Sequence, residues 1–249
     1  LEAKGVPSEG ERAVLQPLVD QSLLSADILT DEAVMAPVSG ARQLDRKNLR
    51  RASQLMDEAG WRVNSDGMRE KDGQVFTLEV LDSSPAFDRI TNPMIENMKA
   101  LGIDARLNRV DTAQESERTR AYDFDVTTHS MRMNFEPSSG LEQYFGTKAM
   151  DQSSRNLMGL SDPAVDALIE KTVRAQSKAE LNTNIRALDR VLRAKRFWIP
   201  QWFKAVHTVA YYDQYGYPDP LPPFARGELD FWWFDADKAA KLKSAGVLN

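Results

Sequence analysis

The sequence contains no cysteine and only two histidines in 249 residues. Without cysteine the protein forms no disulfide bond, a composition that fits an oxidising compartment as well as a reducing one. His129 and His207 lie on different segments and lack nearby carboxylates at the spacing of a metal site. The sequence therefore predicts no metal site.

Motifs of catalysis are also missing. The chain has no glycine-rich phosphate loop, no nucleophile elbow and no HExxH helix. Asp123 and Asp125 lie close together, but no second element of a mechanism accompanies them, so we expect them to pair with the arginines just before them, Arg118 and Arg120. The sequence thus predicts a protein that is not an enzyme, with no catalytic residue and no cofactor.

Long apolar runs and basic blocks are absent too. No run approaches the roughly eighteen apolar residues of a membrane span, and the N-terminus does not look like a signal peptide, so we expect no direct membrane insertion. The basic residues cluster only around Arg50 and Arg51, and the net charge is -5. This balance argues against a nucleic-acid partner.

The sequence does contain one regular run, from Gln74 to Ser130, in which strand and helix patterns alternate. Apolar and polar residues alternate in the strand-like stretches, and the stretches between them fit helices by their apolar spacing or their length. The predicted elements are strands at 74–81, 103–108 and 122–127 and helices at 90–101 and 111–121. Strands separated by helices need crossover connections and lie parallel. The predicted fold class is therefore α/β, with a mainly parallel βαβαβ sheet.

Further elements flank this run. A helix at 45–59, with Asp45 as its cap, has one apolar stripe, and two Asp-Gly turns after it predict a small antiparallel ribbon. Two helices, starting at Asp162 and Ser177, are expected to pack antiparallel. The aromatic stretch from Arg196 to Tyr212 has a strand-like pattern.

Ligands of such sheets sit beyond the carboxyl ends of the strands, which here are followed by Asp82–Ser84, Asp111–Thr112 and His129–Asn134. The segment 129–160 shows little periodicity beyond a short helix near 141–145, and it mixes polar and aromatic residues, as a pocket for a flexible organic ligand does. An ordinary loop anchored by its aromatic residues is the alternative. The candidate ligand-binding residues are Met131, Arg132, Asn134, Glu142, Arg155 and Asn156.

Several motifs occur in an order that resembles a known family. They are NLRRASQLMDEAGW, a strand reading YDFDV, SSRNLMGLSDPAVDALIEK and RFWIPQW. Together they resemble the C-terminal half of extracellular solute-binding proteins, family 5, which serve peptide and nickel ABC importers. GVPSEGE near the start and LDFWWFD near the end are most similar to the YejA-type receptors for oligopeptides and microcin C.

The resemblance implies a periplasmic receptor whose two lobes close over an oligopeptide or peptide-like ligand and which delivers it to the membrane permease subunits of an ABC importer. It implies a lobe like those of type II periplasmic binding proteins. Residues 1–44 would be an arm leading from a missing first lobe, 45–200 the ligand-binding lobe, and 201–249 a segment returning to the missing lobe. The start of the chain at Leu1 fits such a piece.

One position departs from the family pattern. Where peptide receptors of this family carry an Asp that binds the ligand's amino terminus, this sequence has Asn134, with Met131 in place of an aromatic residue. Glu136 or Glu142 are the candidate substitutes. A receptor for a sugar, an opine or a metal chelate, and an isolated interaction module acting through the aromatic tail, are the alternative functions.

Overall fold

A computed structural model describes residues 1–131, 137, 139–150, 155–204, 206, 208–222 and 228–248. These residues form two compact units, Leu1–Ile199 and Pro200–Asn249, and each is described by itself. Two of the predicted ligand-binding residues, Arg132 and Asn134, lie outside the described residues, as do Glu136 and His207.

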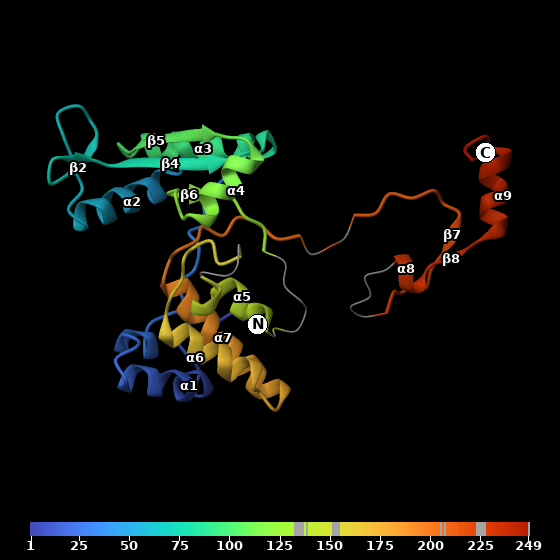
Figure 1. Ribbon diagram of the computed structural model, residues 1–249, viewed down its shortest axis with the longest axis horizontal. Coiled ribbons are helices and arrows are strands. Elements are labelled where there is room, and N and C mark those ends of the chain that lie inside the picture. The colour runs from blue at the N-terminus through green and yellow to red at the C-terminus, as the bar shows by residue number, and fades with distance from the viewer. Residues whose placement is uncertain are drawn as a thin grey trace. The chain divides into compact units, whose positions relative to one another are not determined.

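The larger unit contains a three-stranded parallel sheet in the order β5-β4-β6 (Figure 1). Its strands are β4 (Thr77–Asp82), β5 (Asp104–Arg109) and β6 (Val126–Thr127). Two helices provide the crossovers, α3 (Asp88–Lys99) after the turn η2 (Pro85–Phe87), and α4 (Thr112–Arg120). The predicted α/β class and its parallel sheet are confirmed.

The third strand is shorter than the predicted 122–127. Before it pairs with β4, the side chain of Asp125 accepts a hydrogen bond from the backbone N–H of Glu79 at 2.8 Å. This side-chain contact takes the place of a backbone ladder bond, so regular pairing with β4 begins only at Val126.

The helix α3 packs on β5 and buries its apolar side over the sheet (Figure 1). Ile95 of α3 joins Val80, Ile103 and Ala105 in one core cluster. After the helix, Gly102 adopts a φ of +85°, and a Cβ there would lie 2.7 Å from the carbonyl oxygen of Gly67. Only glycine fits this close approach without strain.

The ribbon before the sheet has three antiparallel strands, β1 (Arg62–Val63), β2 (Arg69–Lys71) and β3 (Gln74–Val75). The predicted strand 74–81 is therefore wrong as one element, because its first two residues pair back into the ribbon and only 77–82 enter the parallel sheet. Arg69, 2% exposed, fixes this junction by donating to Asp57 and to the carbonyl oxygens of Trp61 and Leu101.

The helix α2 (Arg46–Glu58) begins at Asp45, as expected, and the Asp45 side chain accepts from the N–H of Asn48 at 2.9 Å. Its apolar stripe is only partly covered, since Leu55 is 42% exposed and no residue of the helix is fully buried. Met56 packs against the core of the sheet. The helix is confirmed, and part of its apolar stripe remains exposed.

A second core joins four helices and includes residues from both ends of the larger unit. The helices are α1 (Glu9–Asp20), α5 (Gly140–Phe145), α6 (Pro163–Val173) and α7 (Lys178–Ala194), with short turns η1 (Ala26–Leu29) and η3 (Thr147–Ala149). Leu15 and Leu18 of α1 are buried in this core together with Leu168 and Leu188. Residues before 35, expected to form an arm, thus pack within the larger unit.

The smaller unit pairs β7 (Tyr215–Gly216) with β8 (Trp233–Phe234) and contains the helices α8 (Glu228–Phe231) and α9 (Ala236–Ser244). The rings of three tyrosines surround Trp232 at centroid distances of 4.5 to 6.0 Å. The predicted strand at 196–212 is wrong for the described residues of that stretch, which carry no strand. Phe197 and Trp198 pack against the helical core of the larger unit, whereas large apolar side chains after Pro200 are exposed, 87% at Phe203.

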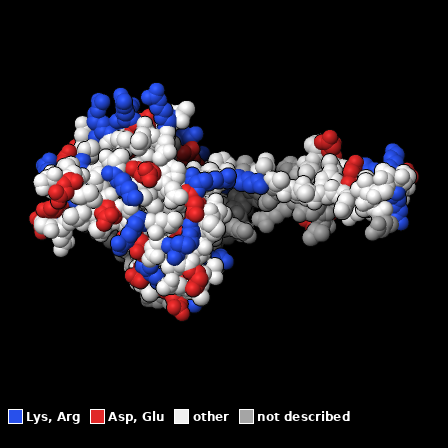
Figure 2. All heavy atoms as spheres, turned by 90° about the horizontal axis from the view of Figure 1, so that it is seen from above, with Lys and Arg blue, Asp and Glu red and all other residues white. Residues whose placement is uncertain are grey.

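Within the described residues, no helix combines the length and the apolar character needed to cross a membrane. Figure 2 shows basic and acidic side chains mixed over most of the face in view, with a row of basic ones along its upper edge. Charge of one sign therefore does not dominate this face.

Candidate functional site

The parallel strands bring polar residues from distant parts of the sequence to one edge of the sheet. Asp82 ends β4 and lies directly opposite Arg109, which ends β5. Thr127 ends β6 on the other side of β4. Since ligands of parallel sheets bind beyond the carboxyl ends of the strands, this edge is the candidate site.

Asp82 is the most buried acidic residue of the edge, with 4% of its surface exposed. Its Oδ1 accepts from the N–H of Ser84 at 2.8 Å and lies 3.3 Å from Arg109 Nη1. Its Oδ2 is buried and has no hydrogen-bond partner among the residues that the structure describes. Arg109 also pairs with Asp88 at the start of α3, so one guanidinium serves two carboxylates.

Two further carboxylates come from the second crossover. Glu115 of α4 accepts from the hydroxyl of Ser83 at 2.6 Å and from its N–H at 3.3 Å. Asp111 caps α4 by accepting from the N–H of Gln114 at 2.8 Å. These contacts involve four carboxylates, Asp82, Asp88, Asp111 and Glu115, and the guanidinium of Arg109, so the formal charges of these five described residues sum to -3.

His129 follows the third strand and does not reduce this negative charge at neutral pH. Partial burial lowers the pKa of His129 below its ordinary value of 6.5. A lowered pKa means that the imidazole is neutral at pH 7. His129 therefore adds no positive charge to these five residues at pH 7.

A network behind the edge holds α4 against the sheet. Arg118 of α4 donates to Glu79 of β4 at 2.8 Å and to Asp123 at 2.9 Å, so the expected pairing of Asp123 with an arginine is confirmed. Hydrogen bonds from Asn108 and then Arg118 lower the pKa of Glu79 despite its partial burial. This network fixes the helix that carries Glu115.

The irregular segment after β6 is joined to the α/β part by Tyr122. The Tyr122 hydroxyl lies 2.6 Å from the carbonyl oxygen of Met150 and 3.1 Å from that of Asn156. Gly159 lies against the Tyr122 ring, where a Cβ would be 3.5 Å away. Met150, Asn156 and Gly159 are thus held against Tyr122, shortly before the third strand.

Asn156, a predicted ligand-binding residue, is fully buried. Its Nδ2 donates to the carbonyl oxygens of Gly146 and Leu160 at 3.1 and 2.9 Å, and its Oδ1 accepts from the N–H of Leu160 at 2.9 Å. Both amide hydrogens are therefore used within the segment. Asn156 therefore shapes the loop within this chain, and its role in ligand binding stays a prediction.

The other described candidates divide into two groups. Met131 packs against the helical core. Glu142 and Arg155 are exposed, and the Arg155 guanidinium lies 5.6 Å from the centroid of the Tyr144 ring and 2.5 Å from Gln143 Oε1. Glu142 and Arg155 thus present charge to solvent beside α5, and their role in ligand binding stays a prediction.

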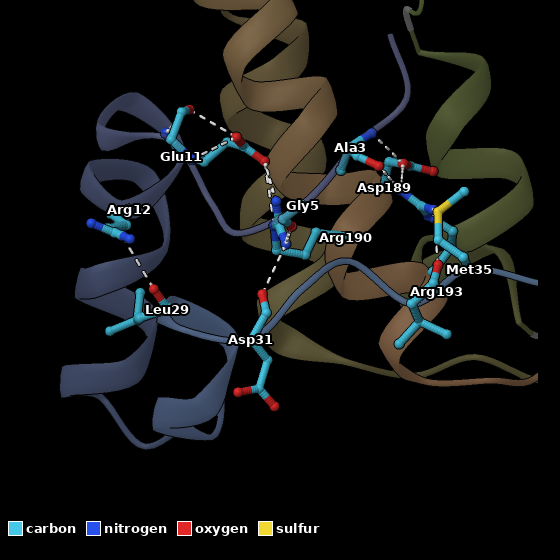
Figure 3. Close-up of polar contacts among 12 residues, drawn as sticks. Ala3, Gly5, Glu11, Arg12, Leu29, Asp31, Met35, Asp189, Arg190 and Arg193 are labelled. Atoms are coloured by element: carbon cyan, nitrogen blue, oxygen red, sulfur yellow. Dashed lines mark hydrogen bonds and ion pairs between the residues drawn. The ribbon is translucent and has the colours of Figure 1, made fainter.

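A buried ion pair holds the N-terminal residues against α7 (Figure 3). Arg190, 1% exposed, donates to Glu11 Oε1 at 3.1 and 3.3 Å and to the carbonyl oxygens of Gly5 and Asp31. Burial raises the pKa of Glu11, but hydrogen bonds from Ser8 and Arg190 outweigh it, and the net pKa is lowered. This pair stabilises the helical core that supports α5.

The sequence analysis missed Arg109 and Glu115 as parts of the candidate site. Arg109 is the last residue of β5, and Glu115 lies in the first turns of α4, the helix that follows the same strand. Charged residues at these two places are the signal that identifies them. In the described part of the chain, no group of three or more histidines or carboxylates is placed to hold a metal ion.

Comparison with known proteins identifies relatives of this chain. Residues 10–152, more than half of the chain, match the family described as bacterial extracellular solute-binding proteins, family 5 Middle. The uncharacterized protein y4wM of Sinorhizobium fredii is 37% identical over 249 residues, which cover 99% of this chain and 37% of that protein. The probable peptide-binding protein YejA of Agrobacterium fabrum is 37% identical over 235 residues, 94% of this chain and 38% of that protein.

Among solved structures, the oligopeptide-binding protein AppA of Bacillus subtilis, in complex with a nonapeptide, matches with a TM-score of 0.55 and 18% identity. The match covers 79% of this chain and 44% of AppA. At this identity the match shows a shared fold. The chain spans less than two fifths of the length of the two relatives above.

Proposed function

Because this chain belongs to family 5 of the bacterial extracellular solute-binding proteins, we propose that it forms one wall of a cleft that binds oligopeptides or peptide-like compounds in a periplasmic receptor. The family consists of binding proteins and not of enzymes, so the wall binds and releases its ligand unchanged. The ligand passes to the membrane permease subunits of an ABC importer.

The observation that carries the proposal is the common edge of the strands. Asp82, Arg109 and Glu115 meet there although they lie on three different elements. The anchored segment after β6, with Glu142 and Arg155 exposed beside α5, supplies further polar groups. Such a surface suits a ligand rich in amides and charges, as a peptide is.

The similarity to the probable peptide-binding protein of Agrobacterium fabrum supports the peptide class. A receptor for a sugar, an opine or a metal chelate is the competing function. No contact among the described residues favours one of these ligands.

We also propose that the smaller unit packs against a part of the receptor outside this chain, as residues 201–249 would if they returned to another lobe. The support is that the relatives are more than twice as long and that large apolar side chains of this unit are exposed. The exposed fractions are 60% at Trp202, 87% at Phe203, 54% at Trp233 and 61% at Phe234. Such exposure in one small unit is typical of a surface that is covered by a partner.

The deciding experiment uses the full-length receptor that contains this chain. Ligands that co-purify with it are identified by native mass spectrometry, and binding of defined peptides is measured by calorimetry. We expect peptides to co-purify and to bind. Recovery of a sugar, an opine or a metal chelate, together with no binding of any peptide, would overturn the peptide class.

A further inference from the structure

The acidic edge of the sheet has one feature that its own hydrogen bonds do not account for. Asp82 is buried, yet only its Oδ1 is engaged, by Ser84 and Arg109. Its Oδ2 is buried with no partner in the described part of the chain. A buried carboxylate oxygen without a hydrogen bond is energetically unfavourable. A hydrogen-bond donor that reaches such an oxygen therefore lowers the free energy of the folded protein.

The charges around Asp82 decide which kind of donor fits. Arg109 contacts both Asp82 and Asp88, so its positive charge is shared between two carboxylates. Two more carboxylates, Asp111 and Glu115, belong to the same edge. The remaining charge of -3 stabilises a second cation there and repels an anion.

The Arg109 side chain is 32% exposed and that of Asp88 is 38% exposed, whereas that of Asp82 is 5% exposed. A ligand group that approaches Asp82 from the side of Arg109 therefore meets the Arg109–Asp88 pair first. That pair is a surface contact whose net contribution to stability is small, so its rearrangement costs little.

We propose that Asp82 Oδ2 is a subsite for a cationic group of the ligand, an ammonium or a guanidinium, at the carboxyl edge of β4 and β5. This inference rests on the proposed peptide-binding function and narrows it to peptides that carry a positive group at this position. Asp82 binds the cation, while Asp88, which shares Arg109 with it, and Glu115, which contacts the neighbouring Ser83, add negative charge. A charge-assisted hydrogen bond of this kind favours the charged ligand over a neutral one of the same shape.

The test measures the affinity of the full-length receptor for matched pentapeptides by calorimetry. One series places arginine, citrulline or glutamate at each position of an otherwise polyalanine peptide, and a second series compares free with acetylated amino termini. Arginine and citrulline differ in charge but hardly in shape. At one position, or at the amino terminus, the cationic peptide should bind at least about tenfold more tightly than its neutral counterpart.

Two variants locate this preference. Asp82→Asn should reduce it to less than about threefold, because the amide has the same shape but no charge. Asp104→Asn removes an exposed carboxylate at the opposite, amino-terminal end of β5 and should leave the preference unchanged. Thermal unfolding of both variants tests whether they are folded.

The outcomes separate the inference from the proposed function. Peptide binding without any preference for a cationic group in the unaltered receptor would overturn the subsite and leave the peptide function intact, and this measurement needs no variant. A preference that survives Asp82→Asn would also overturn the subsite. Failure of every peptide to bind would overturn the proposed function and the inference with it.

Discussion

Arg190 on α7 and Glu11 on α1 form an ion pair at 3.1 Å in which both side chains are almost fully buried, with 2% and 5% exposed. The guanidinium also donates to two backbone carbonyl oxygens, of Gly5 and Asp31, and Glu11 also accepts from Ser8. The contacts of Arg190 join α7 to the N-terminal residues Gly5, Glu11 and Asp31 (Figure 3). The helical core therefore depends on a contact between the two ends of the larger unit.

Glu11→Gln should lower the free energy of unfolding by about 3–5 kcal/mol, because it leaves the buried Arg190 guanidinium without its counter-charge. Urea denaturation followed by fluorescence measures this change. Glu9→Gln is the matched control, since Glu9 is exposed in the first turn of the same helix, and it should change the free energy by less than about 1 kcal/mol. Equal effects of the two substitutions would contradict the role of the pair.

The same pair should make stability depend on pH in the acid range. The pKa of Glu11 is lowered in the folded protein from its ordinary value of 4.5, so the folded state favours the carboxylate more than the unfolded state does. Its stabilising effect is therefore fully present above pH 4.5 and is lost as the pH falls through the lowered folded pKa.

The measurement is the urea midpoint between pH 7 and pH 3, in the unaltered protein and in Glu11→Gln. The unaltered protein should lose more stability below pH 4.5 than the variant, because the variant has no titrating group at this position. Parallel pH curves would show that other carboxylates account for the acid dependence.

Gly102→Ala should destabilise the junction between α3 and the ribbon by more than about 1 kcal/mol. The residue has a φ of +85°, and the added Cβ would lie 2.7 Å from the carbonyl oxygen of Gly67. Gly40→Ala is the control, since Gly40 has no atom within 4 Å of its Cβ position and no positive φ. The free energy of unfolding is measured for both variants. A Gly102→Ala variant as stable as the unaltered protein would contradict the close approach.

Asn156→Ala should loosen the segment between α5 and α6. The substitution leaves the N–H of Leu160 and the carbonyl oxygen of Gly146 without their partner in a buried place, at a cost of about 1–3 kcal/mol. Hydrogen exchange of the Leu160 amide should become faster. Arg155→Ala, at the exposed neighbour, should leave that exchange unchanged, and faster exchange in both variants would show that the segment does not depend on Asn156.

The sequence predicts the local elements well and the contacts between distant residues poorly. The crossover helices and parallel strands follow from periodicity, and the end of α3 follows from Gly102. The split of 74–81 into β3 and β4 does not, because every residue of that stretch has a strand pattern and the break depends on what each end pairs with. Pairing is a property of the fold and not of the stretch itself.

In the candidate site, too, local patterns predict some residues, whereas the positions of others depend on contacts between distant parts of the chain. Strand ends locate Asp82 and the acidic edge, because polar residues directly follow the strand. Arg190 and Glu11, 179 residues apart, meet through packing that no local pattern records. Asn156 was expected at the ligand for its place in a polar loop, whereas its burial depends on how that loop folds around it.

The role proposed for the smaller unit can be tested with one exposed residue. Phe203 is 87% exposed in this chain, so Phe203→Ser should change the melting temperature of the 249-residue chain by less than about 2 °C. In the full-length receptor the same substitution should lower it by several degrees, because there the side chain would be buried against another part of the protein. Val63→Ser, at a 56% exposed position of the ribbon, should leave the melting temperature of both proteins unchanged. A neutral Phe203→Ser in the full-length receptor would mean that this residue is not covered there.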